Sequence, residues 1–112
     1  MAIETVSQEL VLVSLPTQTI DIDKELKKIN GMIGDGPKCD VIIDFAKVEI
    51  ITSSSISNLL ILRGLLTDNQ RSLILCSLKV PTKCIFTVAG LSDAFTFASN
   101  RTEALAAVHA GV

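Results

Sequence analysis

The sequence has few of the residues that metal and disulfide sites require. It contains one histidine, His109, and three cysteines, an odd number with no C-x-x-C pair. Structural zinc sites take four ligands from closely spaced cysteines and histidines, so we expect no metal site in this chain. The thiols of Cys39, Cys76 and Cys84 stand in apolar segments such as LILCSL and PTKCIF, where we expect each to be buried as a small hydrophobic group.

The sequence also lacks a long hydrophobic run and a basic tract. Its apolar runs fall well short of the ~20 residues that a membrane span needs, and its first ten residues, MAIETVSQEL, lack the basic start and apolar stretch of a secretory signal. We therefore expect a soluble, cytoplasmic protein. The ten basic and twelve acidic residues give a net charge of −2, and the longest basic tract is the pair Lys27 and Lys28. This charge pattern excludes binding to DNA or RNA through a basic surface.

Recognisable catalytic motifs are missing as well. There is no G-x-S-x-G nucleophile motif and no G-x-x-x-x-G-K-[ST] phosphate loop, and the glycines of GMIGDG follow a predicted helix instead of a strand. Three carboxylates, Asp40, Asp44 and Glu49, lie near predicted strand ends, but none has a partner at the spacing of an acid and base pair. We interpret them as solvated loop residues, and we expect a non-enzymatic protein without a bound cofactor.

The composition indicates a folded α/β domain. Of the 112 residues, 48% are hydrophobic and 20% are charged, which is typical of a single globular domain over residues 1–112. Short apolar and β-branched runs predict strands at residues 10–15, 39–45, 72–78 and 94–98, with a hairpin partner for the first near Val6. Apolar residues at helical spacing predict helices at residues 24–33, 56–67, 81–89 and 101–108. This alternation predicts a mixed β-sheet of four to five strands with about four α-helices.

Several residues mark the ends of the predicted helices. Asp21 or Asp23 can cap the first helix, and the glycines between residues 31 and 36 indicate where it ends. Pro81 suits the first turn of the third helix, and Gly90 suits its left-handed C-terminal cap.

Four consecutive hydroxyl residues, from Thr52 to Ser55, precede the second helix in EIITSSSISNLLIL. Serine and threonine are favoured at a helix start because a side-chain oxygen accepts a hydrogen bond from a free backbone N–H group. One residue is enough for this cap, so either the cluster is a serine-rich helix start and no more, or it has a further use. A phosphate added to one serine would lie at the positive end of the helix and would add about −1.5 to −2 charges, enough to block a partner.

The second helix carries more apolar residues than one buried face needs. One arc, at about 100° per residue, is the predicted core side and contains Ile56, Leu59, Leu60 and Leu66. Ile61 and Leu65 fall off this arc. We expect these two residues to form a small apolar contact patch beside the serine cluster.

Around this junction the sequence resembles a STAS domain, the module of bacterial anti-sigma factor antagonists and of the cytoplasmic tails of sulfate transporters. The segment DVIIDFAKVEIITSSSISNLLIL resembles the family's apolar strand ending in Asp, its loop, its D-S-S-G segment and the helix that follows. TIDIDKEL resembles the Asp-bearing entry to the first helix, at Asp21. SLILCSL and VAGLSDAFTFASNRTEAL resemble the later strand, the G-L segment and the last helix. The resemblance covers most of the chain.

The resemblance implies which serine is used. It places Ser54 at the position of the serine that a partner kinase phosphorylates in the antagonists, with Ser53 as the second choice. Thr52 stands in place of the usual Asp and Ser55 in place of the usual Gly, so both flanks of the motif differ. Around the serines, the expected partner surface comprises Asp21, Thr52, Ser55, Ile61 and Leu65.

The function implied by the resemblance is that of a non-catalytic bacterial regulator of transcription. The unmodified form would bind an anti-sigma factor serine kinase and so release a sigma factor, and the phosphorylated form would not bind. ATP would be bound by the kinase and not by this chain. The alternative is a non-phosphorylated STAS scaffold, or a subunit of a stressosome-type or lipid-transport complex, because STAS proteins of these kinds also vary at the motif.

Overall fold

The computed structural model describes residues 3–36 and 38–109. At its centre lies a sheet that contains, in spatial order, β1 (Ile3–Ser7), β2 (Leu10–Ser14), β3 (Asp40–Asp44), β4 (Leu73–Cys76) and β5 (Thr96–Ala98). β1 pairs with β2 in antiparallel fashion as the predicted hairpin, and the remaining neighbours are parallel. The sheet is therefore mixed, as predicted.

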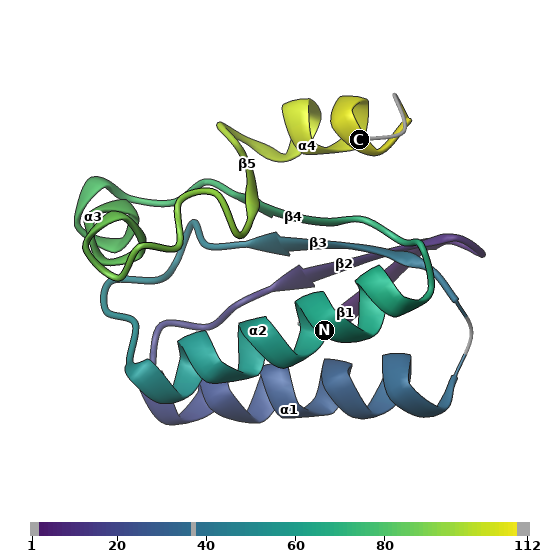
Figure 1. Ribbon diagram of the computed structural model, residues 1–112, viewed down its shortest axis with the longest axis horizontal. Coiled ribbons are helices and arrows are strands. Elements are labelled where there is room, and N and C mark those ends of the chain that lie inside the picture. Colours follow the sequence, from purple (N-terminus) through teal and green to yellow (C-terminus); the bar gives the residue numbers. More distant parts are fainter. Residues whose placement is uncertain (1–2, 37, 110–112) are drawn as a thin grey trace.

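The helices cover the sheet unequally. In chain order they are α1 (Thr19–Asp35), α2 (Ser53–Asp68), α3 (Val80–Val88) and α4 (Arg101–His109). Figure 1 shows α1 and α2 side by side along one face of the sheet, α4 on the opposite face and α3 at one end. Parallel strands need crossover connections, and α1 and α2 provide those from β2 to β3 and from β3 to β4. Both helices consequently begin at the carboxyl edge of the sheet.

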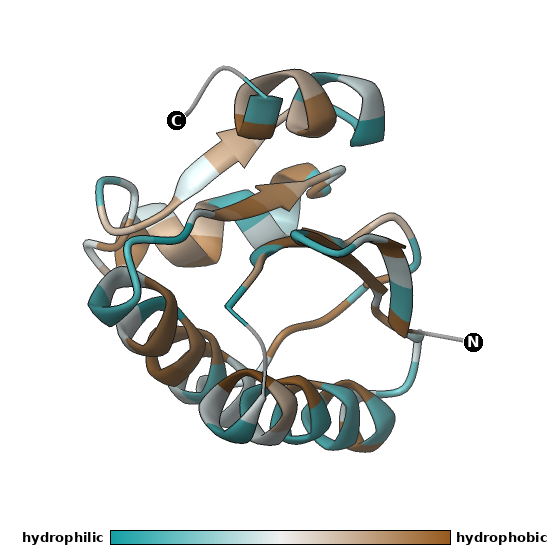
Figure 2. Cartoon of the chain, turned by 90° about the vertical axis from the view of Figure 1, so that its right-hand side faces the viewer, coloured by the Kyte–Doolittle hydropathy of each residue, from teal (hydrophilic) through white to brown (hydrophobic). Residues whose placement is uncertain are grey.

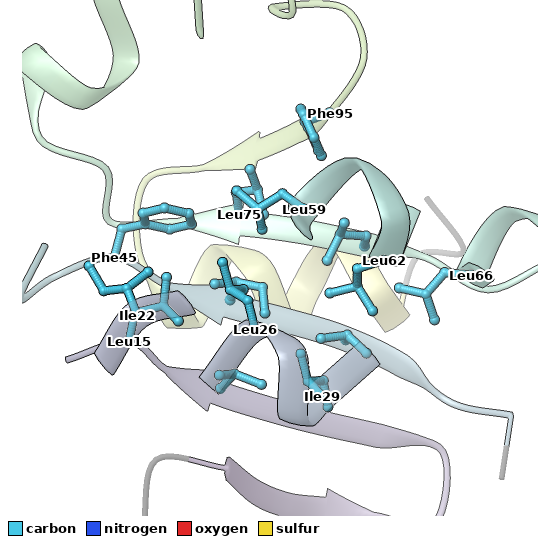
Figure 3. Close-up of a cluster of buried hydrophobic side chains, with 14 of the residues drawn as sticks. Leu15, Ile22, Leu26, Ile29, Phe45, Leu59, Leu62, Leu66, Leu75 and Phe95 are labelled. Carbon is cyan, nitrogen blue, oxygen red and sulfur yellow. The ribbon is translucent and has the colours of Figure 1, made fainter. Parts of the chain in front are cut away.

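The main hydrophobic core lies between the sheet and the pair formed by α1 and α2. Alternate strand residues face this core: Val11, Val13, Val41, Ile43, Leu73 and Leu75. The helices fill it with aliphatic side chains at helical spacing, which are Ile22, Leu26, Ile29 and Ile33 of α1 and Leu59, Leu62 and Leu66 of α2. Figure 3 shows most of these side chains pointing toward one another across the space between the two layers.

The opposite face of the sheet packs on α4. The intervening strand residues form this second core with Ala104, and they are Leu10, Leu12, Ile42, Ile74 and Cys76. Figure 2 shows the hydrophobic strands lying between α4 and the layer formed by α1 and α2. Strands that are buried on both faces read as continuous apolar runs, which explains why β3 and β4 could be found in the sequence.

Helix α1 differs from its prediction at both ends. Gln18 occupies the N-cap position without a side-chain cap, so neither Asp21 nor Asp23 caps the helix. The helix also continues through Gly31 and Gly34, and of the glycines expected to mark its end only Gly36 does so, as the C-cap after Asp35. Its last two turns bury isoleucine side chains in the main core, and this burial outweighs the cost of about 1 kcal/mol for each helical glycine.

The ends of α3 follow the predicted chemistry, and α4 begins with a side-chain cap. Pro81 lies in the first turn of α3, and Gly90, just after this helix, has a left-handed φ of 74°. At the start of α4, the N–H of Glu103 donates a hydrogen bond to the Asn100 side-chain oxygen at 2.9 Å. These local signals depend only on neighbouring residues, so they can be read from the sequence.

The cysteines are not all buried, which corrects one prediction. Cys39 and Cys76 are buried as expected, and desolvation raises the pKa of both thiols. Cys84 is exposed on α3, because Thr82 and Phe86 occupy the buried side of that helix. The apolar residues around Cys84 in the sequence therefore do not indicate burial.

Asp44 at the end of β3 is buried and bonded, which corrects its interpretation as a solvated loop residue. One carboxylate oxygen accepts the N–H of Ala46 at 2.8 Å, and the other accepts a hydrogen bond from Nε of Arg101. Arg101 also donates to the hydroxyl of Ser14 at 2.5 Å. The hydrogen bond that Arg101 donates to Asp44 raises the pKa of the guanidinium, so the group stays charged. These bonds join the start of α4 to the ends of β2 and β3.

The other two carboxylates have partners as well. Asp40 accepts the N–H of Ser72 at 2.8 Å and lies 3.7 Å from the guanidinium of Arg71. It thus links β3 to the start of β4, which the prediction of a solvated role missed. Glu49 is solvent-exposed as expected, and it forms an ion pair with Lys79 at 2.5 Å.

We predict that Asp44→Ala lowers the free energy of unfolding by about 2–3 kcal/mol, because two hydrogen bonds to a buried carboxylate are lost. Urea denaturation followed by circular dichroism measures this change. Lys79→Gln is the matched control, since it breaks an exposed ion pair and should change the free energy by less than about 0.5 kcal/mol. Equal effects of the two substitutions would contradict a structural role for Asp44.

Candidate functional site

The cluster of four hydroxyl residues from Thr52 to Ser55 lies where α2 begins, at the carboxyl edge of the sheet. The loop between β3 and α2 is anchored by Val48 and Ile51, both of which are buried in the main core. At its start, the N–H of Phe45 donates to the carbonyl of Cys76 at 2.9 Å. These contacts fix the place from which the first turn of α2 projects.

Thr52 is the N-cap of α2. Its backbone is extended, its side-chain oxygen accepts the N–H of Ser55 at 3.2 Å, and its carbonyl accepts the N–H of Ile56 at 3.1 Å. A threonine cap contributes about 1 kcal/mol to helix stability. Capping therefore accounts for one of the four hydroxyls.

Ser55 is held by a different bond. Its side chain is fully buried, and its hydroxyl donates to a carboxylate oxygen of Asp23 on α1 at 2.6 Å. A second bond between the two helices runs from the side-chain amide of Asn30 to the carbonyl of Asn58 at 3.1 Å. The Ser55 hydroxyl thus ties α2 to α1 at the end of the helix pair where the serines lie.

Ser53 and Ser54 are left free. Both are exposed in the first turn of α2, and neither hydroxyl has a hydrogen-bond partner in the part of the chain that the structure describes. This first turn contains no acidic residue, so nothing within it neutralises the positive end of the helix. Of the four hydroxyls, these two can be modified without breaking a bond.

Asp23, and not Asp21, contacts the cluster of hydroxyl residues, through Ser55. Asp21 is exposed in the first turn of α1, and among the described residues its side chain forms no ion pair or hydrogen bond. Asp23 is half-buried and accepts the hydrogen bond from Ser55. The signal for Asp23 in the sequence was the surplus of hydroxyls, because a buried serine that is not the cap needs an acceptor.

An apolar surface continues from the serines along α2. Ile61 lies seven residues, or two turns, after Ser54 on the same side of the helix, and it is 54% exposed, as predicted. Leu65, one turn further, is half-buried and packs against the main core, so the expectation that it is exposed was wrong. Leu60, which was expected in the core, is 39% exposed, and Ile50 in the preceding loop is 63% exposed. We call Leu60 and Ile61, which are neighbours on the helix, the α2 patch.

The exposed serine hydroxyls of this site can act as phosphoryl acceptors. Among the described residues, no cluster of three or more His, Cys, Asp or Glu side chains is arranged to hold a metal ion, and no helix is long and apolar enough to cross a membrane. His109 lies in the last turn of α4, on the other face of the sheet from α2. An exposed hydroxyl at a helix start can receive a phosphoryl group, whose negative charge the helix end stabilises by about 0.3–1 kcal/mol.

Comparison with known proteins points to one family. A family model described as the STAS domain matches residues 3–104. No curated protein sequence matches the chain significantly.

Solved structures share the fold at low sequence identity. An anti-sigma-factor antagonist (STAS) domain protein from Planctomyces limnophilus has a TM-score of 0.81 and 20% identity, with 96% of this chain and 97% of that chain covered. The anti-sigma factor antagonist SpoIIAA in its unphosphorylated form has a TM-score of 0.79 and 22% identity, with 96% and 95% covered. A chain of the stressosome, described as a signal integration and transduction hub, has a TM-score of 0.70 and 19% identity, with 96% of each chain covered.

The family match spans the sheet and the start of α4, and the structural matches have the same architecture over nearly the whole chain. The mixed sheet with α1 and α2 on one face agrees with the resemblance found in the sequence. The chain belongs to the STAS domain family.

Proposed function

We propose that this chain is an anti-sigma factor antagonist. In its unmodified form it binds an anti-sigma factor that is a serine kinase, and this binding releases a sigma factor. Phosphorylation of Ser54 by the kinase ends the interaction. The similarity to SpoIIAA, a protein described as an anti-sigma factor antagonist with an unphosphorylated form, supports both the partner and the switch.

The observation that carries the proposal is that two of the four clustered hydroxyl side chains are bonded and two are free. Thr52 and Ser55 are engaged in the cap and in the bond to α1, whereas Ser53 and Ser54 are exposed and free. Ser54 is the first choice for the acceptor because of its position in the family motif that the chain resembles, and it also lies on the same side of α2 as Ile61. A kinase that docks on the α2 patch would therefore meet Ser54 directly.

Phosphorylation can end binding without a change of fold. A phosphate on Ser54 adds about −1.5 to −2 charges at a point two helical turns from the exposed Ile61. A bound partner would have to remove water from this charge beside an apolar contact, which costs more than the contact contributes. The helix itself tolerates the charge at its positive end.

A constitutive STAS scaffold is the second candidate, and one feature of the cap favours it. Thr52 caps α2 with a neutral hydroxyl where the antagonists that the chain resembles usually have Asp. A kinase then lacks a carboxylate acceptor beside its target serine. In such a scaffold the α2 patch would bind its partner without a switch.

We predict that Ser54→Asp keeps the fold and lowers affinity for the cognate kinase by about 10- to 100-fold, because a new charge must be desolvated in the interface. Ser54→Ala should bind like the wild type and should lose the mass gain of one phosphate after incubation with kinase and ATP. Calorimetry and intact-mass measurement give the two results. Thr67→Asp, which places the same charge on an exposed residue at the far end of α2, is the control. No mass gain in the wild type, together with unchanged binding by Ser54→Asp, would exclude the phosphorylation switch and would favour the constitutive scaffold.

The α2 patch gives a separate prediction. Ile61→Ala should weaken kinase binding by about tenfold, and Ile61→Glu should weaken it further, with no loss of helical signal in circular dichroism, because this side chain is exposed. Leu59→Ala, on the buried side of the same helix, should instead lower the free energy of unfolding by about 2–5 kcal/mol. A melted Ile61→Glu protein would assign this side of α2 to the core and exclude it as a docking surface.

Substitution of Ser55 should change the stability of the domain and should not affect phosphorylation of Ser54. We predict that Ser55→Ala lowers the free energy of unfolding by about 1–2 kcal/mol, since the buried hydrogen bond to Asp23 is lost, while Ser54 remains a substrate. A double-mutant cycle with Asp23→Ala should give a coupling energy of about 1 kcal/mol. Ser53→Ala, at an exposed hydroxyl, should change stability by less than about 0.5 kcal/mol. A coupling energy near zero would show that the bond contributes nothing.

A further inference from the structure

We infer that α4 is a strap that opens as a unit while the rest of the domain stays folded, and that its opening uncovers the thiol of Cys76. The strap turns at residues 99–100, which are exposed and lie between the end of β5 at Ala98 and the start of α4 at Arg101. Figure 2 shows α4 on its own side of the sheet, away from α1 and α2. The strap is therefore separate from the serine cluster and does not rest on the proposed function.

Apolar packing holds α4 less firmly than it holds the helices on the other face of the sheet. α4 contributes one fully buried side chain, that of Ala104, together with the partly buried Leu105, Ala107 and Val108. The pair formed by α1 and α2 contributes seven aliphatic side chains that are at most 2% exposed. Burial stabilises in proportion to the apolar area removed from water, so separating α4 from the sheet costs much less than separating α1 and α2.

Opening still has a cost, because the strand residues under α4 lose their cover. These residues are Leu10, Leu12, Ile42, Ile74 and Cys76. The open form is consequently a minor form, populated according to an opening free energy that lies below that of global unfolding.

A row of polar and thiol groups lies beneath the first turn of α4. The strand register places Ser14, Asp44 and Cys76 beside one another on β2, β3 and β4, so their side chains face the same way. Arg101 spans part of this row with its hydrogen bonds to Asp44 and Ser14. Cys76 is 0% exposed. The contacts that close the strap therefore lie next to a buried thiol.

These contacts can be released without disturbing the main core. The Arg101 side chain is 48% exposed, so its guanidinium can exchange Asp44 for water. Two further bonds at this end run from the N–H of Glu103 to the Asn100 side chain and from the N–H of Ser99 to the Glu103 carboxylate. They join residues 99–103 to one another and not to the sheet. α4 can thus leave the sheet as an intact helix.

Alkylation of the full chain with iodoacetamide measures the open form. The thiolate of Cys76 displaces iodide from the reagent, peptide masses distinguish Cys76 from Cys39, and Cys84→Ser removes the exposed thiol. The alkylation rate in urea divided by the rate in the folded chain gives a protection factor. We expect this factor to be at least about 100-fold lower than that of the Leu26 backbone amide of α1 in hydrogen exchange. Equal protection would mean that α4 opens only when the whole domain unfolds, and would overturn the inference.

A substitution in the main core separates the two kinds of opening. Leu59→Ala destabilises the closed and the strap-open forms alike, because α1 and α2 stay packed in both. It should lower the protection of the Leu26 amide by about 30-fold or more and leave that of Cys76 unchanged within about twofold. The milder Ile33→Val, which should lower Leu26 protection by about two- to tenfold, gives the same comparison if Leu59→Ala does not fold. An equal fall at both sites would contradict separate opening.

Arg101→Gln tests the contacts that close the strap. Loss of the charge-assisted bonds to Asp44 and Ser14 should lower the protection of Cys76 by about tenfold. Arg63→Gln is the matched control, since it removes an exposed arginine from α2 on the other face of the sheet and should change protection by no more than about twofold. Unchanged protection in Arg101→Gln would show that these bonds do not hold the strap, and would overturn this part of the inference.

Discussion

The rest of the structure depends on one constraint, which is that the parallel strands β2, β3 and β4 are apolar on both faces. Burying a single face would leave a row of Leu, Ile and Val side chains in water, at a cost of about 25 cal/mol for each Å². The pair formed by α1 and α2 covers one face, and α4 covers the other (Figure 1). A short helix with one fully buried residue, Ala104, would hold only weakly by packing. The bonds from Arg101 to Asp44 and Ser14 therefore fix α4 where it begins.

The same constraint places the serines. Parallel strands force each crossover helix to start at the carboxyl edge of the sheet, so the first turns of α1 and α2 lie at the same end of the molecule (Figure 1). Side-by-side packing of the helices then brings Asp23 to Ser55. The carboxylate and the hydroxyl satisfy each other away from water, and the two neighbouring serines remain at the exposed corner. The position of Ser54 thus follows from the strand order together with one buried hydrogen bond.

Local patterns made most of the fold predictable. Apolar runs located β2, β3 and β4, while Pro81 and Gly90 located the ends of α3. The errors share a cause, since each depends on residues far away in the sequence. Asp44 meets Arg101 across 57 positions, and no periodicity indicates such a pair. The predictions for Leu60 and Leu65 failed because a helical wheel gives the spacing of a face but not which neighbouring element covers it. The prediction for Cys84 failed because apolar neighbours in the sequence do not show which side of the helix is buried. The choice of Ser54 over Ser53 came from resemblance to a family, whereas the free state of both hydroxyls emerged only from the structure.

The two departures from the family's motif have different structural consequences. Thr52 keeps the capping role with an uncharged oxygen, so the start of α2 carries one negative charge fewer than an Asp cap would give it. Ser55 adds a buried hydroxyl where the family usually has Gly, and this hydroxyl is satisfied by Asp23 at 2.6 Å and by the Thr52 hydroxyl at 3.2 Å. Neither change moves the free serines. A phosphate on Ser54 would meet less repulsion from its own chain than beside an Asp cap, while an approaching kinase would find one acceptor fewer. The departures therefore act on the charge around the proposed switch and leave its position unchanged.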